Sequence, residues 1–260
     1  MLFLLSPAKT LDYATPVPAA LREAATRPRF TDHAAELIEL LKLKSPAAVA
    51  RLMDLSAELA ELNVGRYAKW SRRHTDRNSR PAAWAFDGDV YDGLAAKTLS
   101  TDDLLWAQRH VVILSGLYGA LRPLDKLQPY RLEMGTALAN PKGRNLYAYW
   151  GDTIAEQLNA QARGDASPVI VNLASQEYFR AVDGKALKPR IVECVFEDWR
   201  EAGYQVIGFF AKRARGAMAR FAIRQRIATP AGLMAFDVDG YAFDTAVSSA
   251  ERLVFRRRVD

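Results

Sequence analysis

Residues 110–135, HVVILSGLYGALRPLDKLQPYRLEMG, contain the two patterns on which our interpretation of the fold rests. The opening run, HVVILSG, is apolar and β-branched and ends in glycine, which predicts a buried strand. The remainder, 116–135, combines glycines, prolines and clustered charges and has no period of 2 or 3.6. A connection of about 20 residues without regular structure is uncommon unless it is functional. We therefore expect a buried strand that leads directly into a functional loop.

Apolar runs elsewhere in the chain predict further strands around this one. They occur at 2–5 (LFLL), 82–86 (AAWAF), 168–175 (PVIVNLAS), 190–198 (RIVECVFED), 204–212 (YQVIGFFAK), within 233–244 (LMAFDVDGYAFD) and at 252–257 (RLVFRR). The runs at 190–198 and 204–212 are close enough in sequence to form a hairpin.

Apolar residues at helical spacing predict the helices. These are expected at 32–44, 46–62, 64–74, from about 101 to 110, 147–161 and 211–228. Because strands and helices alternate early and strands pair late, the fold class is predicted to be mixed α/β (α+β), with one central mixed sheet wrapped by helices. No composition shift or flexible linker marks a boundary, so we expect residues 1–260 to form a single domain.

The composition is that of an ordinary globular protein. Half of the 260 residues are hydrophobic and a quarter are charged, which excludes wholesale disorder. No apolar run reaches the roughly 20 residues of a membrane helix, and the start, MLFLLSPAKT, lacks the basic and long apolar regions of a signal peptide. The single cysteine, Cys194, excludes a disulfide framework and cysteine-based zinc or iron–sulfur sites. We expect a cytoplasmic protein without membrane attachment.

Positive charge is concentrated in two short segments. The formal net charge of the chain is +6. Residues 66–80 alone carry +5 and residues 212–226 carry +6, so the rest of the chain is acidic. Such clustering is typical of a protein with a polyanion partner, such as nucleic acid. Two solvated helix faces in a mildly basic protein would give the same pattern, so charge alone leaves both interpretations open.

The familiar motifs of nucleotide-binding, redox and hydrolytic enzymes are absent from the sequence. It holds no G-x-x-x-x-G-K-[ST], no G-x-G-x-x-G and no G-x-S-x-G. The three histidines, His33, His74 and His110, are scattered and form no zinc-binding pair. We therefore expect no cofactor and no dedicated metal site.

Lys9 follows the predicted strand 2–5 in the segment SPAKT. In open α/β sheets, ligands bind at the carboxyl ends of strands. A lysine in this place can neutralise a phosphate or, if it is desolvated, act as a Schiff-base nucleophile; otherwise it is a surface lysine in a polar loop. A second polar segment, 172–179 (NLASQEYF), also follows a predicted strand, so its side chains either point to the same cleft or cap a helix.

The loop after the central strand contains two possible arginine–carboxylate pairs. Arg122 precedes Asp125, and Arg131 precedes Glu133. The partners can hold each other in a structural loop, or the arginines can bind a bidentate anion at the wall of a site.

The segment 212–220, KRARGAMAR, places basic residues at the start of a predicted helix. Cations in that position oppose the helix dipole at a small cost in free energy. We therefore interpret this charge as serving phosphate binding rather than the helix itself.

Two predicted helices meet within 46–73, where we expect a helix–hairpin–helix-like element. The glycines of such a DNA-binding hairpin let the backbone approach a phosphate. Here the hairpin would be 59–63, LAELN, in which Glu61 and Asn63 stand at the glycine positions. An ordinary helix hairpin explains the same pattern, although the basic run at 66–80 favours the DNA-binding interpretation.

Blocks spread over the chain together resemble the YaaA family of peroxide stress proteins. They are SPAKTLDY (6–13), GDVYDGL (88–94), SGLYGALRPLDKLQPYRLEMG (115–135), NLASQEYF (172–179), KRARGAMARF (212–221) and GYAFD (240–244). The blocks extend from the first predicted strand to near the end of the chain, and the long central block is highly specific.

This resemblance implies a cytoplasmic bacterial protein of the hydrogen peroxide response that limits DNA damage and lowers free intracellular iron. It also implies a fold particular to the family, with a positively charged cleft and a helix–hairpin–helix element that falls on 46–70 here. The partners that it implies are double-stranded, bubbled and branched DNA. It establishes no reaction, so whether the protein is an enzyme stays open.

We therefore interpret the chain as a DNA-binding protein of oxidative stress that contacts backbone phosphates largely independently of sequence. The expected phosphate contacts are Lys9, Arg66, Lys69, Arg72, Arg73, Arg122, Arg131, Lys212, Arg213, Arg215 and Arg220. The residues expected to stack on an unpaired base are Tyr118, Tyr130 and Tyr178. In a repair step of the lyase or glycosylase kind, Lys9 would be the nucleophile, and the acid–base partner would be Asp89, Asp125 or Glu133.

The main alternative is a metabolic enzyme that acts on a small anionic substrate, phosphorylated or carboxylated, in the same cleft. A third interpretation is direct binding of iron by the carboxylates of Asp87, Asp89, Asp92, Asp237 and Asp239, which no set of histidines or cysteines supports. The sequence predicts no protein partner.

Overall fold

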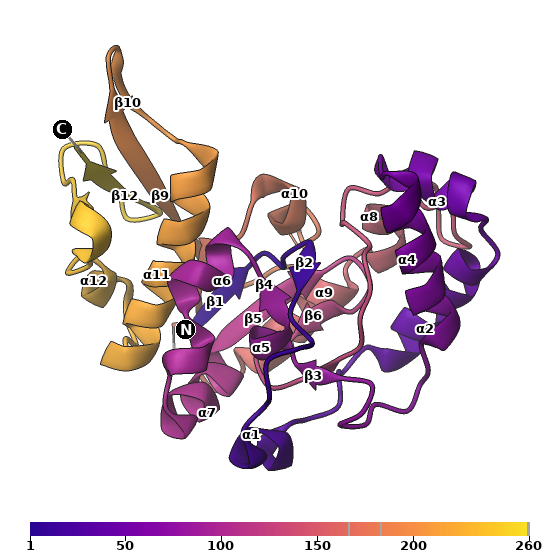
Figure 1. Ribbon diagram of the computed structural model, residues 1–260. Helices are drawn as coiled ribbons and strands as arrows, with labels where there is room; N and C mark the ends of the chain where they lie inside the picture. Colours follow the sequence, from indigo (N-terminus) through magenta and orange to yellow (C-terminus); the bar gives the residue numbers. More distant parts are fainter. Residues whose placement is uncertain (166, 183, 259–260) are drawn as a thin grey trace.

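The computed structural model describes residues 1–165, 167–182 and 184–258. The strands of its main sheet are β1 (Leu2–Leu5), β5 (Val111–Ser115), β6 (Gly119–Leu121), β8 (Val169–Leu173), β9 (Arg190–Arg200), β10 (Gly203–Gln205), β11 (Ala242–Phe243) and β12 (Arg252–Arg257). They are arranged in the order β11-β12-β9-β8-β1-β5-β6, and β10 pairs with β9 alone (Figure 1). From β12 to β5 the neighbours are parallel, whereas β11, β6 and β10 pair antiparallel. The predicted fold class, with one central mixed sheet, is confirmed.

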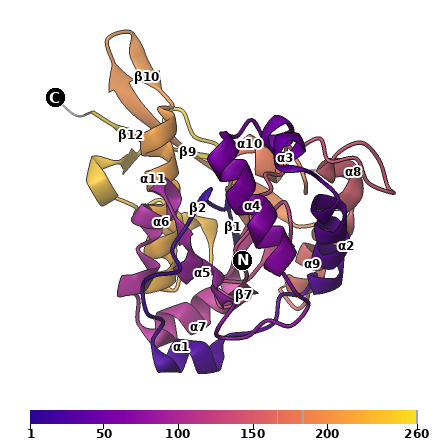
Figure 2. The ribbon, with the colours of Figure 1, turned by 45° about the vertical axis from the view of Figure 1, so that its right-hand side comes forward.

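Helices surround this sheet. Their bounds are α1 (Ala19–Ala24), α2 (Thr31–Lys42), α3 (Pro46–Met53), α4 (Ala57–Lys69), α5 (Ala82–Ala85), α6 (Asp89–Leu94), α7 (Thr101–His110), α8 (Leu146–Trp150), α9 (Thr153–Gln161), α10 (Gln176–Phe179), α11 (Gly208–Gln225) and α12 (Pro230–Leu233). The long helix α11 packs on β9, β8 and β1, and α7 packs on β1 and β5. In both Figure 1 and Figure 2, α2, α3 and α4 form a group on the side of the molecule away from α11.

The central strands are buried along their whole length. Every residue of β1, β5 and β8 is buried, as expected for parallel strands that are covered on both faces. This is why the continuous apolar runs at 2–5, 110–116 and 168–175 predicted them correctly. Nearly all of the buried apolar side chains belong to one continuous cluster.

The loop 116–135 is packed against this core instead of being a free surface loop. It contains β6 and a short strand, β7 (Lys126–Leu127), which pairs with β3 (Arg80–Pro81). A second short pair joins β2 (Thr10–Leu11) to β4 (Phe86–Asp87). At Gly116 an added Cβ would lie 2.3 Å from the carbonyl oxygen of Leu132, so only glycine allows the loop to return this closely to the end of β5.

The predicted hairpin at 59–63 is wrong. Helix α3 ends at Met53, Asp54 adopts a left-handed conformation, and α4 begins after Ser56, whose side chain accepts a hydrogen bond from the backbone N–H of Leu59. This N-cap restarts the helix before the expected turn, so Glu61 and Asn63 lie inside α4. Two helices do meet within 46–73, but their connection is the segment 54–56, which holds no glycine.

Four other predicted elements differ in the structure. The run at 82–86 forms helix α5 before the short strand β4, because the stretch after Pro81 is rich in alanine, a strong helix former. The run at 204–212 leaves the sheet after Gln205 and enters α11 at Gly208. The predicted helix 147–161 is broken at Gly151, which has a positive φ of 45°, and only Ala242–Phe243 of the stretch 233–244 is a strand.

Within the described residues, none of the helices is both long enough and apolar enough to cross a membrane.

Candidate functional site

The direction of strand addition reverses between β1 and β8. The chain passes from β1 to β5 on one side, and then adds β8, β9 and β12 on the other side of β1. At such a switch point the loops after the two strands diverge and leave a crevice at their carboxyl ends. Ser6 follows β1 and Ser175 lies just beyond β8, and the backbone N–H of Ser175 donates to Oγ of Ser6 at 2.9 Å.

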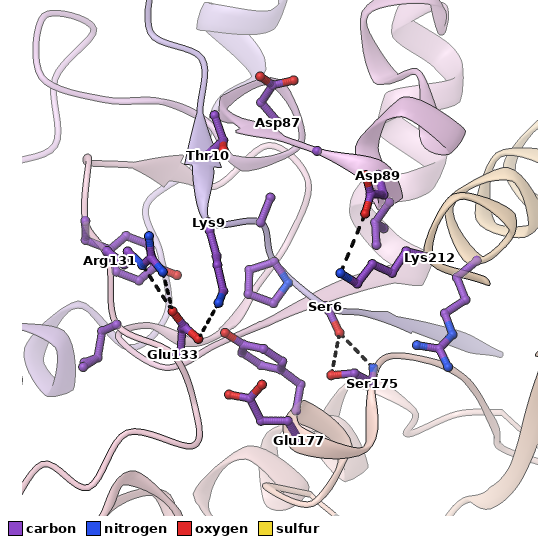
Figure 3. A pocket seen from close by; sticks show the side chains of 18 residues that line it. Ser6, Lys9, Thr10, Asp87, Asp89, Arg131, Glu133, Ser175, Glu177 and Lys212 are labelled. Carbon is purple, nitrogen blue, oxygen red and sulfur yellow. Dashed lines mark hydrogen bonds and ion pairs between the residues drawn. The ribbon is translucent and has the colours of Figure 1, made fainter. Parts of the chain in front are cut away.

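A cavity of about 470 Å³ opens above this pair of serines, and we call it the switch-point cavity. Its walls come from segments that are far apart in sequence: the loop after β1, the β4–α6 junction, the loop 130–133, the start of α10 and the first half of α11. Its polar lining residues are Ser6, Lys9, Thr10, Asp87, Asp89, Tyr130, Arg131, Glu133, Ser175, Glu177, Tyr178, Lys212 and Arg215. Figure 3 shows how most of these side chains face one another.

Glu133 lies between two cations of the cavity. Its Oε2 is 3.1 Å from Nζ of Lys9, and its Oε1 is 3.0 Å from Nη2 of Arg131 (Figure 3). The Lys9 side chain is 63% exposed. An exposed, ion-paired ammonium lacks the desolvated surroundings that activate a lysine as a nucleophile.

The opposite wall depends on a close approach of α6 and α11. A Cβ on Gly93 would lie 2.0 Å from the carbonyl oxygen of Arg213, and one on Gly216 would lie 1.8 Å from that of Val90. Only glycines permit this contact between the helix backbones. It brings Asp89, at the start of α6, to 3.7 Å from Nζ of Lys212 (Figure 3).

Arg215 is the cation of the cavity that differs from the other three. Within the described part of the chain its guanidinium has neither a hydrogen bond nor an ion pair, although it is half-buried. Burial lowers the pKa of Arg215 below its usual value, and the charge of Glu193 partly opposes that shift. Glu193 thus acts on Arg215 through its charge without forming an ion pair, and a half-buried guanidinium that lacks a hydrogen-bonded partner is stabilised when an anion joins it.

The formal charges of the lining residues balance. The cations are Lys9, Arg131, Lys212 and Arg215, and the acids are Asp87, Asp89, Glu133 and Glu177. Glu177 also accepts a hydrogen bond from the backbone N–H of Gly135 at 2.8 Å. The cavity thus carries no excess of formal positive charge. Among its four cations, Arg215 is the one that makes no ion pair with the described residues.

The expectation that three tyrosines stack on a base is contradicted by their burial. Tyr118, Tyr130 and Tyr178 are 0%, 5% and 7% exposed, which leaves too little ring surface for a base to stack on. Tyr118 accepts a hydrogen bond from Nε1 of Trp70 at 2.8 Å, and the hydroxyls of Tyr130 and Ser115 are 2.6 Å apart. Burial raises the pKa of all three phenols.

Arg122 and Asp125 form a structural pair away from the cavity, so Asp125 is not an acid–base partner of Lys9. Asp125 is fully buried, its Oδ1 is 2.8 Å from Nη2 of Arg122, and it also accepts a hydrogen bond from Thr26 at 2.6 Å. Of the two interpretations of this pair, mutual ion pairing is correct.

The basic segment 212–220 divides its residues among different roles. Lys212 and Arg215 line the cavity, whereas Arg213 pairs with Asp239 at 3.1 Å. Arg220 donates to the carbonyl oxygens of Leu94 and Ala95, so it closes the end of α6 and is not a free phosphate contact.

The first basic segment is also divided. Arg66 lies close enough to Arg131 for that charge to lower its pKa, after the larger effect of burial. Arg72 pairs with Asp32, and both Arg72 and Arg73 line a different cavity. No contact of the Lys69 side chain ties it to the switch-point cavity within the described residues.

The segment 172–179 reaches the cleft, as one of its two interpretations expected. Ser175 and Glu177 line the cavity, and the side chain of Ser175 makes no capping hydrogen bond to α10. Ser6 and Asp87, which were not given a role in phosphate binding, also line it, and both lie at or just beyond the end of a strand. Asp87 and Asp89 do not form a metal cluster, since the described residues contain no group of three or more His, Cys, Asp or Glu side chains placed to hold an ion.

Comparisons with known proteins agree over almost the whole chain. A family model described as peroxide stress protein YaaA matches residues 1–247. A UPF0246 protein of Leptothrix cholodnii is 63% identical over 257 residues, which cover 99% of this chain and 98% of that one. Similar proteins of Bordetella pertussis and Variovorax paradoxus are 62% and 59% identical, with 99% of each chain covered. The similarity therefore extends over the sheet and over the segments that line the cavity.

Proposed function

Because the chain belongs to the YaaA family of peroxide stress proteins, we propose that it protects DNA during hydrogen peroxide stress by binding the DNA backbone. In this proposal the switch-point cavity holds one phosphate group of a strand, and cations elsewhere on the surface hold others. Duplex, bubbled and branched DNA all present such phosphates, so binding is largely independent of base sequence. Family membership supports the stress role, and the charges of the cavity support the anion.

The position of Arg215 is the observation that carries this proposal. Lys9 and Arg131 share Glu133, and Lys212 is opposed by Asp89. Arg215 lines the same cavity without such a partner in the described part of the chain. A guanidinium binds phosphate through two parallel hydrogen bonds, and a bound phosphate would supply the hydrogen-bonded anionic partner that Arg215 lacks.

A repair reaction of the lyase kind at Lys9 is a separate hypothesis, which the proposed DNA binding does not require. A lyase step would need the Lys9 amine to lose its proton and attack C1′ of an abasic sugar, with release of water as the imine forms. Asp89 and Glu133 are the remaining candidates for the acid–base partner. Since Lys9 is exposed and ion-paired, we expect binding without imine formation, and borohydride treatment of the complex with abasic DNA should trap no adduct.

The test compares Arg215→Gln with the wild-type protein. Loss of a charge-assisted phosphate contact should weaken binding of a short duplex roughly 10- to 100-fold, as measured by fluorescence anisotropy at constant salt. Lys188→Gln is the control, because Lys188 is an exposed cation just before the amino end of β9, whereas the cavity lies at the carboxyl ends of the parallel strands. If both variants bind like the wild type, the cavity does not hold a phosphate of the strand.

A second candidate function is the conversion of a small anionic substrate in the same cavity. The observation that favours it is the combination of size and charge: about 470 Å³ is typical of small-molecule sites, and the balanced lining suits a ligand of low charge. This function predicts saturable binding of phosphorylated or carboxylated metabolites that depends on Arg215, together with weak, salt-insensitive binding of DNA.

A further inference from the structure

A chain of aromatic rings connects the switch-point cavity with a second cavity at the surface. Tyr130 lines the switch-point cavity, and its ring centre lies 5.5 Å from that of Tyr118. The ring centre of Tyr118 lies 6.5 Å from that of Trp70 and 6.0 Å from that of His74. His74 is half-buried and lines a separate cavity of about 300 Å³. These separations are typical of rings in direct contact, so the four rings form a path from one cavity to the other.

The hydrogen bonds of Tyr118, at the centre of this path, direct its hydroxyl proton towards His74. The hydroxyl oxygen accepts hydrogen bonds from Nε1–H of Trp70 at 2.8 Å and from the backbone N–H of Gln128 at 3.4 Å. Both partners are donors only, so neither can accept the single hydroxyl hydrogen. The other polar contact of this hydroxyl among the described residues is Nε2 of His74, at 3.4 Å. We therefore assign a long hydrogen bond from Tyr118 to His74.

The second ring nitrogen of His74 determines the tautomer that can accept this proton. Nδ1 lies 3.3 Å from the carbonyl oxygen of Arg72, which can only accept, so the ring hydrogen of neutral His74 is assigned to Nδ1. Nε2 is then the acceptor. Burial, with smaller effects of Arg27 and Lys126, lowers the pKa of His74 to about 4, so the ring is neutral near pH 7. Burial raises the pKa of Tyr118, so its hydroxyl keeps its proton in the resting protein.

We propose that Tyr118 and His74 form a redox-active pair that takes up one oxidising equivalent from a strong one-electron oxidant such as the hydroxyl radical. Tyr118 gives one electron to the oxidant and its hydroxyl proton to Nε2 of His74, so that a neutral tyrosyl radical and an imidazolium form. The electron converts the hydroxyl radical to hydroxide. The proton that His74 then releases to solvent converts this hydroxide to water, so the net products are one tyrosyl radical and one water molecule.

The surroundings of Tyr118 suit this step. Loss of an electron turns a phenol into a strong acid, so even a weakly basic imidazole accepts the proton if it lies within reach. Trp70 and Tyr130 extend the path of the electron towards the two cavities, so the oxidant need not contact Tyr118, which is 0% exposed. The same burial prevents two such radicals from coupling to each other. This activity goes beyond the proposed DNA binding and does not depend on it.

The test oxidises the purified protein, without DNA, with azide radicals generated by pulse radiolysis, since these remove single electrons from aromatic rings. The tyrosyl radical is followed by its optical absorption and, after rapid freezing, by electron paramagnetic resonance. Tyr118→Phe should lose most of the tyrosyl signal of the wild type. His74→Gln keeps a polar side chain without a basic nitrogen, and it should slow formation of the radical about a hundredfold or more, because the positioned proton acceptor is lost.

Tyr91→Phe is the matched control. Tyr91 is also buried, but its hydroxyl donates to the carbonyl oxygen of Ser6 at 3.1 Å, which is too weak a base to take up the proton. This variant should form the radical like the wild type. A tyrosyl signal that Tyr118→Phe leaves unchanged, or a rate that His74→Gln leaves unchanged, would overturn the assignment of the pair. If Tyr118→Phe does not fold, the rate in His74→Gln decides alone.

Discussion

Lys9 and Arg131 share the carboxylate of Glu133, so the charge of each cation is already partly compensated before a ligand binds. Lys212 is opposed in the same way by Asp89. Arg215 alone lines the switch-point cavity without a partner among the described residues. At the scale of single residues, the cavity therefore combines compensated cations, which hold its walls together, with one group that can bind an anion.

Cys194 is the only cysteine of this peroxide stress protein, and its surroundings make it unreactive. It is fully buried, and burial, with a smaller effect of Glu193, raises the pKa of its thiol. Since the thiolate is the nucleophile that attacks peroxide, we predict no sulfenic acid in the folded protein at peroxide concentrations that oxidise an exposed thiol. Mass spectrometry after dimedone trapping measures this, with protein unfolded in urea as the positive control; a trapped adduct in the native protein would contradict it.

His74 makes stability depend on pH. Burial, with smaller effects of Arg27 and Lys126, lowers the pKa of His74 from 6.5 to about 4. Between these two values the unfolded chain binds a proton that the folded chain does not, so the free energy of unfolding falls as the pH falls from 6.5 towards 4. The contribution is at most about 3 kcal/mol.

Urea unfolding of the wild type and of His74→Gln at several pH values measures this effect. The variant should lose less stability over the range than the wild type. The pKa values of the Asp12 and Asp76 carboxyls are lowered chiefly by hydrogen bonds from Lys97 and Lys126, so their contribution to stability falls away progressively from about pH 5 downwards. This loss is common to the wild type and the variant, so the difference between their pH profiles isolates His74. Parallel pH profiles of the two proteins would show that His74 is not the group responsible.

At the scale of elements, the contact between α6 and α11 positions one wall of the cavity. Gly93 and Gly216 let the two helix backbones touch, and this contact holds Asp89 beside Lys212. The position of the cavity wall therefore depends on residues that do not themselves line it.

We predict that Gly216→Ala lowers the free energy of unfolding by about 1–3 kcal/mol, because its Cβ would lie 1.8 Å from the carbonyl oxygen of Val90. Gly65→Ala is the matched control: Gly65 also lies in a helix, and a Cβ there meets nothing within 4 Å. It should be neutral or stabilise the protein by up to about 1 kcal/mol, through the better helix propensity of alanine. Thermal unfolding compares the two, and equal stability would show that α6 and α11 can separate without cost.

The elements that the sequence predicted correctly are those whose structure is determined by neighbouring residues in the chain. The buried strands at 2–5 and 168–175 are continuous apolar runs, and α7 begins where a capping residue, Ser100, precedes it. The hairpin was predicted too late in the chain, because the helical spacing of apolar residues continues through 54–56. The first helix ends there, and the N-cap Ser56 begins the next one. The strand-end rule correctly placed Lys9 and the segment 172–179 at one site, and the short spacing of Arg122 and Asp125 indicated their pairing. The partner of Arg220, the end of α6, depends on tertiary packing that no local pattern reveals.

At the scale of the whole molecule, the excess positive charge lies away from the cavity that the fold creates. The switch-point cavity is balanced in formal charge, whereas the two adjoining cavities that share Ala25 and Lys126 are lined by several cations and by one acidic residue, Asp76. The positive charge of the chain is thus concentrated away from the switch-point cavity.

The most direct test of the account is the affinity of the wild-type protein for a duplex and for a bubbled oligonucleotide of equal length across a salt series. We predict that both are bound and that log K falls linearly with log salt, by about 0.9 for each phosphate contacted. Absence of binding at physiological salt, or an affinity that salt does not change, would contradict DNA binding and leave the conversion of a small anionic substrate as the function that the cavity supports.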